Sequence, residues 1–468
     1  MSQAISLSVL DSLPPENREL TPILFRERHQ TVILDDDPTG TQTVHGITVL
    51  TDASVALLTE QFQTPDRAFF ILTNSRALPT GQASALITRI CRNLRAAAGA
   101  TGHTFTVILR GDSTLRGHFP AEPEAVEMAL DAPFDKWLIC PFFEEGGRFT
   151  VQGIHYVREG ERLIPVADTP FAHDVSFGYR HSDLREWVEE KTGGAVRARE
   201  IGLLSIGNIR QLSVLELANQ LAQPIRIWVT NAVSLRDVEI VSAACRRLET
   251  RGIRILYRTG ASFVQAYLGL QKRPPLSLNE LIDDRLTGQA APGGLVVIGS
   301  YVPKTTAQFA KLAQTPELEK VELNVERLLA DAPHDAEISD ATRRVNASLR
   351  AGQTAVLFTS RRLITGNDPA TNLQIGQRVS DALVAVVEGL TVRPRFFIAK
   401  GGITSSDVAT KGLNVRKATI LGQALPGVPV WQLGDESRFP GLAYIVFPGN
   451  VGSDTALAEL IQTLSRGK

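Results

Sequence analysis

Three adjacent carboxylates end an apolar run in the segment Thr31-Val-Ile-Leu-Asp35-Asp36-Asp37-Pro38-Thr39-Gly40. The first four residues have the composition of a β-strand, and the Pro and Gly that follow the acids turn the chain. Because like charges repel, such a triplet is kept at a strand end where a divalent cation, an arginine or a substrate hydroxyl faces it. Ligands bind at the carboxyl ends of strands in open α/β sheets. The segment therefore predicts a binding site, with a solvated acidic turn as the alternative.

The composition is that of a globular protein without a surplus of positive charge. The 468 residues include 49 Lys and Arg against 50 Asp and Glu, which gives a formal net charge of −1. A chain of this length exceeds one ordinary domain, so two domains are expected. No run rich in Lys or Arg is present to bind a phosphate backbone. We therefore expect no nucleic-acid partner.

Neither a membrane anchor nor a disulfide framework is expected. No window of the chain approaches the roughly 18 consecutive apolar residues that indicate a membrane helix. The N-terminal segment lacks the charged and apolar regions of a signal peptide. The cysteines are Cys91, Cys140 and Cys245, and their odd number and wide spacing fit neither disulfide pairs nor a zinc site. The sequence thus predicts a soluble cytoplasmic protein with no membrane partner.

Short apolar strands alternate with polar or Gly-rich turns and amphipathic helical segments along the chain. This alternation predicts an α/β fold of two domains, each a mainly parallel sheet flanked by helices in a Rossmann-like three-layer arrangement. The predicted organisation is a substrate-binding domain over residues 1–272, a Pro- and Gly-rich linker over 273–294 and a second domain over 295–468. The active site is expected in the cleft between the domains. Residues 146–176 look like an irregular loop or a hairpin, and residues 321–330 are predicted to form a helix.

In the first half, several predicted strands run into polar residues at their carboxyl ends. These residues are Asn74, Ser75 and Arg76 after one strand, Arg110, Asp112, Arg116 and His118 after the next, and Arg258 near the end of a later one. If the strands are parallel neighbours, one crevice collects acids, hydroxyls and arginines. Such a crevice suits a small hydroxylated anion, because arginine binds a carboxylate or phosphate in a planar fork. The alternative is an internal network of ion pairs. His118 has no second His or Cys at metal-ligand spacing, so a structural or substrate-positioning role is favoured.

Three turns in the second half share one pattern, in which a strand is followed by a glycine turn with hydroxyl residues and then by a helix. They contain Gly299-Ser300, Lys400-Gly401-Gly402-Ile403-Thr404 and Pro448-Gly449-Asn450-Val451-Gly452. Glycine lets backbone N–H groups approach an anion closely, and a helix N-terminus adds positive partial charge. Together the turns predict a nucleotide or phosphate site. No GxxxxGK[ST] or GxGxxG motif is present, which argues against a P-loop and against an NAD-dependent oxidoreductase.

Three classes of function are compatible with these features. An acid-rich crevice joined to a phosphate-binding domain favours phosphoryl transfer from a nucleotide to a small hydroxylated acid. The first alternative is a phosphatase of the haloacid dehalogenase type, whose DxDxT motif fits Asp35, Asp37 and Thr39, with Thr73 in its second motif. That alternative leaves the three glycine turns without a role. The second alternative is a non-catalytic sugar-acid sensor, which needs no nucleotide.

Taken together, the motifs resemble those of the four-carbon acid sugar kinase family. In the family's order they are Asp35-Asp36-Asp37-Pro38-Thr39-Gly40, Asn74-Ser75-Arg76, Asp112-Ser113-Thr114-Leu115-Arg116-Gly117, Gly147-Arg148, Gly153-Ile154-His155-Tyr156-Val157, Gly299-Ser300, Gly401-Gly402-Ile403-Thr404-Ser405 and Pro448-Gly449-Asn450-Val451-Gly452. The resemblance implies an N-terminal acid-sugar-binding domain and a C-terminal ATP-binding domain. It also implies ATP-dependent phosphorylation of a compound such as threonate, erythronate or an oxo-tetronate.

The resemblance also implies roles for individual positions. The family's opening motif falls on Asp35, Asp36, Thr39 and Gly40, its Ser-Arg pair on Ser75 and Arg76, and the Lys before its DST motif on Arg110. The ATP-binding turns fall on Ser300, on residues 401–404 and on residues 449–452. Asp37-Pro38 stands where the family commonly has an aromatic residue, which leaves the identity of the acid open.

The predicted site has a substrate part and a nucleotide part. Asp36 and Asp112 are the two candidates for the base that accepts the proton of the attacking hydroxyl. The substrate-binding residues are Asp35, Asp37, Thr39, Asn74, Ser75, Arg76, Arg110, Arg116 and His118, and the ATP-binding residues are Ser300, Gly401, Gly402, Ile403, Thr404, Gly449, Asn450 and Gly452. Mg²⁺ is expected with ATP, but its ligands cannot be separated from the base among the aspartates. The oligomeric state stays open, with a homodimer as one possible state.

Overall fold

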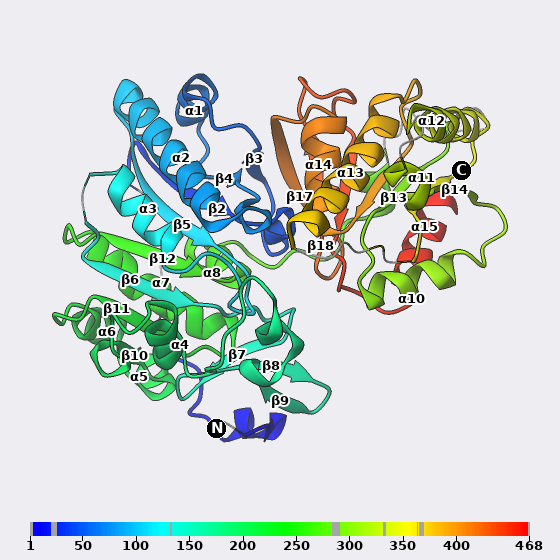
Figure 1. Ribbon diagram of the computed structural model, residues 1–468. Coiled ribbons are helices and arrows are strands. Elements are labelled where there is room, and N and C mark those ends of the chain that lie inside the picture. The colour runs from blue at the N-terminus through cyan, green and yellow to red at the C-terminus, as the bar shows by residue number, and fades with distance from the viewer. Residues whose placement is uncertain are drawn as a thin grey trace. The chain divides into compact units, whose positions relative to one another are not determined.

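The computed structural model describes residues 3–19, 26–131, 133–282, 291–330, 334–362, 364 and 369–466. The chain divides into two compact units, unit 1 over Met1–Lys272 and unit 2 over Arg273–Lys468. Each unit contains a sheet with helices on both of its faces (Figure 1). The α/β class predicted from the alternation of strands and helices is confirmed.

The described strands of the main sheet in unit 1 are all parallel. Their order is β10 (Gly202–Leu204), β11 (Ile227–Thr230), β6 (Lys136–Cys140), β12 (Ile255–Thr259), β5 (Thr104–Arg110), β2 (His29–Asp35), β4 (Ala68–Leu72) and β3 (Ile47–Leu50). Asp35, at the end of β2, is in register with Leu72 of β4 and Arg110 of β5. The polar segments that follow these strands therefore leave the sheet side by side.

Helices cover both faces of this sheet. One face packs against α1 (Val55–Phe62), α2 (Thr80–Thr101), α3 (Ala121–Ala129) and α4 (Leu184–Lys191) in a single apolar core. Leu256 belongs to that core, whereas the next residue of β12, Tyr257, points to the opposite face and lies against Phe263. That face carries α7 (Leu235–Glu249) and α8 (Ala261–Leu268), with α5 (Ile206–Gln211) and α6 (Val214–Leu221) against α7.

The segment over residues 146–176 contains a second, antiparallel sheet. Its strands β7 (Arg148–Val151), β8 (Ile154–Glu159) and β9 (Arg162–Pro165) form consecutive hairpins, and β1 (Ile5–Ser6) pairs with β9. Gln152 and Gly153 join β7 to β8 with φ values of 52° and 83°, which suit a tight two-residue hairpin turn. On β8, the buried His155 donates from Nε2 to the carbonyl of Ser113 at 2.8 Å. The hairpin thereby supports the loop that follows β5.

The sheet of unit 2 combines parallel and antiparallel strands. Its order is β17 (Lys417–Leu425), β18 (Val428–Leu433), β19 (Ala443–Phe447), β16 (Phe397–Lys400), β13 (Leu295–Ile298), β15 (Ala355–Thr359) and β14 (Glu319–Leu323). The strands from β19 to β14 are parallel, and β18 runs antiparallel to both of its neighbours. The parallel part therefore has one edge at which all carboxyl ends gather.

Helices also cover both faces of the unit 2 sheet (Figure 1). On one face, α10 (Pro303–Leu312) and α15 (Ala456–Arg466) share an apolar core with the strands. The other face carries α12 (His334–Arg350), α13 (Pro369–Glu388) and α14 (Gly402–Asp407).

The helix predicted over residues 321–330 exists only in its second part, and its first residues were assigned wrongly. This segment is the end of strand β14 followed by the short helix α11 (Val325–Leu329). Val321 and Leu323 are buried on either side of the exposed Glu322, which is the two-residue period of a strand. The side chain of Asn324 then accepts a hydrogen bond from the backbone N–H of Arg327 and begins the helix.

Part of the expected linker belongs to unit 2. Leu276, Leu281 and Ile282 are buried in its core, next to the short helix α9 (Leu278–Leu281). These apolar side chains pack against the sheet, which a free linker would not do. Residues 283–290 of the expected linker lie outside the described residues.

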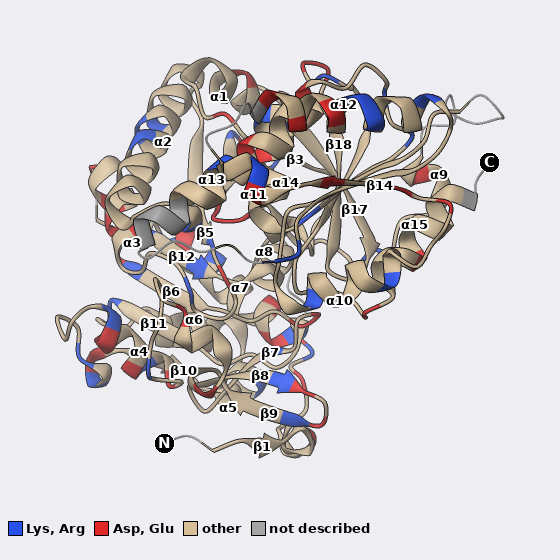
Figure 2. Cartoon of the chain, turned by 45° about the vertical axis from the view of Figure 1, so that its right-hand side comes forward, with Lys and Arg blue, Asp and Glu red and all other residues tan. Residues whose placement is uncertain are grey.

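Basic and acidic residues are interspersed over both units (Figure 2). Within the described part of the chain, no helix has the length and apolar character needed to cross a membrane. The three cysteines are buried and form no disulfide.

Candidate functional site

The acidic triplet lies where the central strands of unit 1 end. Asp35 closes β2, and the side chain of Asp37 accepts a hydrogen bond from the backbone N–H of Thr39 at 2.8 Å, which starts the short helix over Pro38–Thr41. A methyl group at Gly40 would overlap the carboxylate of Asp35, so the turn requires glycine there. The sequence thus folds the triplet into a buried cluster, and the alternative of a solvated turn does not hold.

Each arginine predicted to bind substrate contacts a carboxylate of this region. Arg76 bonds to Asp37 and lies 3.7 Å from Asp112, Arg110 Nη1 bonds to Asp35 Oδ1 at 3.1 Å, and Arg116 Nε bonds to Asp112 Oδ2 at 2.6 Å. The internal network of ion pairs considered from the sequence is therefore present. It also places the predicted substrate residues within one cluster.

Asp36 differs from its neighbours. Its side chain is 4% exposed, and neither of its carboxylate oxygens has a hydrogen-bond partner among the described residues. The nearest cationic atom is Arg110 Nη1, which lies 3.7 Å from Asp36 Oδ1. A buried carboxylate left without hydrogen bonds is costly, so a partner such as a ligand hydroxyl fits this position.

The acids of the cluster differ in protonation behaviour. Burial raises the pKa of Asp35 to about 7, although the Arg110 guanidinium acts against this shift. Burial also raises the pKa of Asp112, but the guanidiniums of Arg116 and Arg76 outweigh it and hold this pKa below its usual range. Asp112 therefore stays ionised and is a weak proton acceptor.

Hydrogen bonds from His118 and to Glu122 hold Ser75, the residue that precedes Arg76. The hydroxyl of Ser75 donates to Glu122 Oε1 at 2.5 Å, and Nε2 of His118 donates to the carbonyl of Ser75 at 3.0 Å. Asn74 adopts a left-handed backbone with φ of 50°, which turns the chain after β4. Burial raises the pKa of Glu122 to about 7, opposed by the Arg258 guanidinium.

The three glycine turns of unit 2 lie next to one another. Ile298 of β13 is in register with Lys400 of β16, which is in register with Phe447 of β19, so the turns leave three adjacent parallel strands. Gly401 has φ of 114°, a conformation that other residues rarely adopt. A methyl group at Gly449 would lie 3.1 Å from Ser300 Oγ. The turns thus pack closely against one another.

Helix α10 holds the third turn in place. Thr305 Oγ1 donates to the carbonyl of Gly449 at 2.9 Å, and Nε2 of Gln308 donates to the carbonyls of Val451 and Ser453 at 2.9 and 2.8 Å. Two other predicted residues, Ile403 and Asn450, are exposed.

Lys400 also supports the nucleotide-side turns, although sequence reasoning did not include it. Its side chain is fully buried, and Nζ donates to the carbonyls of Pro448 and Gly449 at 2.5 and 3.3 Å. Burial lowers the pKa of Lys400 to about 7, and the Lys304 ammonium acts in the same direction. Lys400 therefore ties the second turn to the third.

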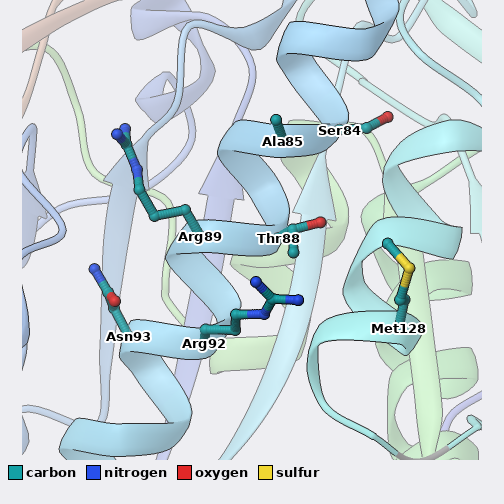
Figure 3. A pocket seen from close by; sticks show the side chains of 7 residues that line it. All are labelled: Ser84, Ala85, Thr88, Arg89, Arg92, Asn93 and Met128. Atoms are coloured by element: carbon teal, nitrogen blue, oxygen red, sulfur yellow. The ribbon is translucent and has the colours of Figure 1, made fainter.

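Metal-binding side chains and surface grooves are two further features that can mark a functional site. Within the described residues, no group of His, Cys, Asp and Glu side chains is arranged to hold a metal ion. A groove between α2 and α3, lined by Thr88, Arg92 and Met128 among others (Figure 3), carries no carboxylate and none of the residues that follow the strands.

Comparison with known proteins identifies the two halves of the chain. Residues 31–267 match the model of a sugar-binding N-terminal domain, and residues 295–457 match that of a nucleotide-binding C-terminal domain. The chain belongs to the four-carbon acid sugar kinase family. No curated protein matches it.

Solved structures of other proteins share the fold of this chain. A Salmonella typhimurium LT2 protein provisionally named a tRNA synthase is 17% identical, with 93% of this chain and 99% of that one covered at a TM-score of 0.66. A Haemophilus influenzae protein described with the family model DUF1537 is 18% identical, with 93% and 100% covered at a TM-score of 0.58. At such low identity these likenesses support the fold alone.

The structure brings the predicted residues of each half together. The substrate residues gather after β2, β4 and β5, and the nucleotide residues after β13, β16 and β19. Sequence reasoning did not include Glu122 and Lys400, and it noted Arg258 without placing it in the site. Lys400 directly precedes the Gly401-Gly402 pair, which was a local signal for it. Glu122 lies in a helix, and no local signal marked it.

Replacing Lys400 by Met removes the titrating group and keeps most of its volume. The unfolded chain holds this proton up to about pH 10.5, whereas the folded chain releases it near pH 7, so the stability of the wild type rises with pH between these values. We therefore expect the unfolding temperature of the wild type to rise relative to that of K400M from pH 7 to pH 10, measured by calorimetry. Replacement of the exposed Lys311 by Met controls for the loss of one charge. A difference that stays constant with pH would contradict the lowered pKa.

Proposed function

We propose that this protein is an ATP-dependent kinase that phosphorylates a hydroxyl group of a small four-carbon acid sugar. The observation that carries the proposal is the buried Asp36 with unpartnered oxygens in a sugar-binding domain, together with glycine turns on three adjacent strands of a nucleotide-binding domain. The first feature suits a polyhydroxy substrate, and the second suits a polyphosphate. A chain that binds both kinds of molecule has what phosphoryl transfer requires.

Asp36 is the better of the two candidate bases. Asp112 accepts hydrogen bonds from Thr114 and Arg116, and its lowered pKa makes it a poor proton acceptor. Asp36 has no competing hydrogen bond, so an incoming hydroxyl can donate to it directly. Asp112 and its arginines then position the substrate rather than take its proton.

The turns of unit 2 fit the phosphates of a nucleotide. Ser300, Gly401 and Gly449 present backbone and small hydroxyl groups, and phosphate oxygens accept hydrogen bonds from such N–H and O–H donors. ATP supplies the phosphoryl group, and Mg²⁺ neutralises the charge that develops in transfer. Because the described residues contain no ready metal cluster, the cation is expected to bind with the nucleotide.

The contacts of Asp35 and Asp37 weigh against the phosphatase alternative. Asp35 is bonded to Arg110 and its pKa is raised by burial, and Asp37 is bonded to Arg76 and Thr39. A nucleophilic carboxylate needs an oxygen free of competing hydrogen bonds, and these contacts engage both oxygens of Asp37 and one oxygen of Asp35. The sensor alternative leaves the nucleotide-binding domain without use.

The direct test is ADP release by the purified protein with MgATP. The panel consists of four-carbon sugar acids and their 2- and 3-oxo forms, with phosphorylated compounds as controls. We expect ADP release that depends on one or a few of the acids. If no acid increases ADP release and a phosphorylated control loses phosphate, the result supports the phosphatase. Binding of an acid without either reaction supports the sensor.

Replacing Asp36 by Asn preserves its shape but removes its ability to accept a proton. We expect kcat to fall about 100- to 10,000-fold, the usual contribution of a general base, with ATP affinity unchanged. Asp112→Asn is the matched variant, and its main effect is expected on KM for the acid, because it weakens the contact that positions Arg116. Steady-state kinetics decides, and the reverse assignment follows if D112N loses kcat while D36N does not.

Replacing Gly449 by Val tests the nucleotide half separately. A methyl group there already lies 3.1 Å from Ser300 Oγ and 3.2 Å from Val302 Cγ2, so a branched side chain must displace the turn. We expect the Kd for ATP, measured by calorimetry, to rise about 10- to 100-fold, with binding of the acid retained. Gly99→Val is the control, since a side chain at Gly99 meets open space. Unchanged ATP binding in G449V would remove the third turn from the nucleotide site.

A further inference from the structure

Arg258 is a buried cation of the substrate half that acts electrostatically on Glu122 but has no carboxylate within 4 Å among the described residues. It lies in β12, next to the strand that ends at Arg110, and is 7% exposed. Arg76, Arg110 and Arg116 each have a carboxylate within 4 Å, but within the described residues Arg258 forms no ion pair. Burying an unpaired guanidinium is costly, which indicates that an anion completes this position.

Few of the donors of Arg258 are used. Nη2 donates to the carbonyl of Arg116 at 3.1 Å, which fixes the guanidinium beneath the loop after β5. Nε is buried and has no hydrogen-bond partner among the described residues. A methyl group at Gly111 would overlap the guanidinium, so the loop passes over Arg258 only because glycine stands there. The residue is thus held in place with donor capacity left over.

A second glycine separates Arg258 from Asp36. A methyl group at Gly117 would lie 2.9 Å from Arg258 Nη2 and 3.4 Å from Asp36 Oδ2. The guanidinium and the carboxylate therefore face the same small space at Gly117, yet they form no hydrogen bond to each other. An unsatisfied cation and an unsatisfied acid at one place suit a ligand that carries an anionic group beside a hydroxyl group.

We propose that Arg258 binds the carboxylate of the substrate while Asp36 accepts a hydrogen bond from one of its hydroxyls. This inference rests on the proposed function and deepens it, because it assigns the recognition of the acid group to a residue outside the predicted arginines. Those three arginines are occupied by Asp37, Asp35 and Asp112. Arg258 differs from these three in having no carboxylate within 4 Å among the described residues, and its Nε has no hydrogen-bond partner there. The recognised class is a short hydroxy acid with the hydroxyl near the carboxylate.

Arg258→Met and Arg258→Lys test the assignment by equilibrium binding. Calorimetry measures the Kd of threonate and erythronate and of the corresponding amides, in which a neutral group replaces the carboxylate. We expect R258M to raise the Kd of the acid about 10- to 100-fold, the usual effect of losing a charged hydrogen bond, and to leave the Kd of the amide within a few-fold. R258K keeps the charge but loses the planar fork, so an intermediate Kd is expected.

Arg254→Met is the matched control, because Arg254 directly precedes the same strand at its opposite end. Arg254 lies over Phe134, away from the acidic cluster, so its variant should bind the acid as the wild type does. Thermal unfolding of all variants identifies any loss of fold.

Equal Kd values of the acid for R258M and the wild type overturn the inference. An equal increase in the Kd of the acid and of the amide overturns it as well. The inference also fails if Arg116→Met, rather than R258M, abolishes the preference for acid over amide. Because binding is measured without ATP, a protein that binds the acid through Arg258 but releases no ADP would refute the kinase and leave this assignment standing. Conversely, ADP release with unchanged binding by R258M would keep the kinase and refute the assignment.

Discussion

The substrate half depends on burying like charges at the end of β2. Asp35, Asp36 and Asp37 are consecutive and largely removed from water, so each carries a desolvation cost and repels the others. Arg110 and Arg76 offset this cost by bonding to the first and third acids. Arg110 ends β5 and Arg76 follows the end of β4, so both lie beside the acidic triplet because these parallel strands end in register with β2. The middle acid is left without a hydrogen bond, and the chemistry proposed here begins at that residue.

In the nucleotide half, parallel strands also end side by side, but the residues at their ends are of a different kind. Its three adjacent strand ends carry glycines and small hydroxyl residues rather than paired charges. The side chains of Lys400 and Thr305 hold the third turn by hydrogen bonds to the carbonyls of Pro448 and Gly449. A polyphosphate is large and highly charged, so many backbone N–H groups suit it better than a few side chains. A four-carbon acid is small, and it needs a few well-placed charges instead. The two chemistries therefore agree with the two families of domain that the chain matches.

The sequence was sufficient for the features that depend on local pattern. The strand that ends in Asp35 and the three glycine turns are each visible as an apolar run followed by turn residues, and parallel packing then brings them together. Residues 321–330 were predicted wrongly because a two-residue period over a short strand is easily taken for part of the helix that follows it. Glu122 and Arg258 could not be assigned from pattern at all. Their roles depend on side chains that are distant in sequence, such as Ser75 for Glu122 and the loop carbonyl of Arg116 for Arg258.

The ion pairs in the structure change the role that the arginines were predicted to have. From sequence, arginines near acids suggest anion binding, and Arg76, Arg110 and Arg116 were interpreted in that way. In the structure these arginines pair with the aspartates and hold them in place, and the lowered pKa values of Asp37 and Asp112 show that two of the acids are also kept ionised. Arg258 forms no ion pair within the described residues and keeps an unpartnered Nε, so we assign the binding of an additional anion to it. Recognition of the substrate is therefore better inferred from unsatisfied groups, here Asp36 and Arg258, than from the number of charges that gather at the strand ends.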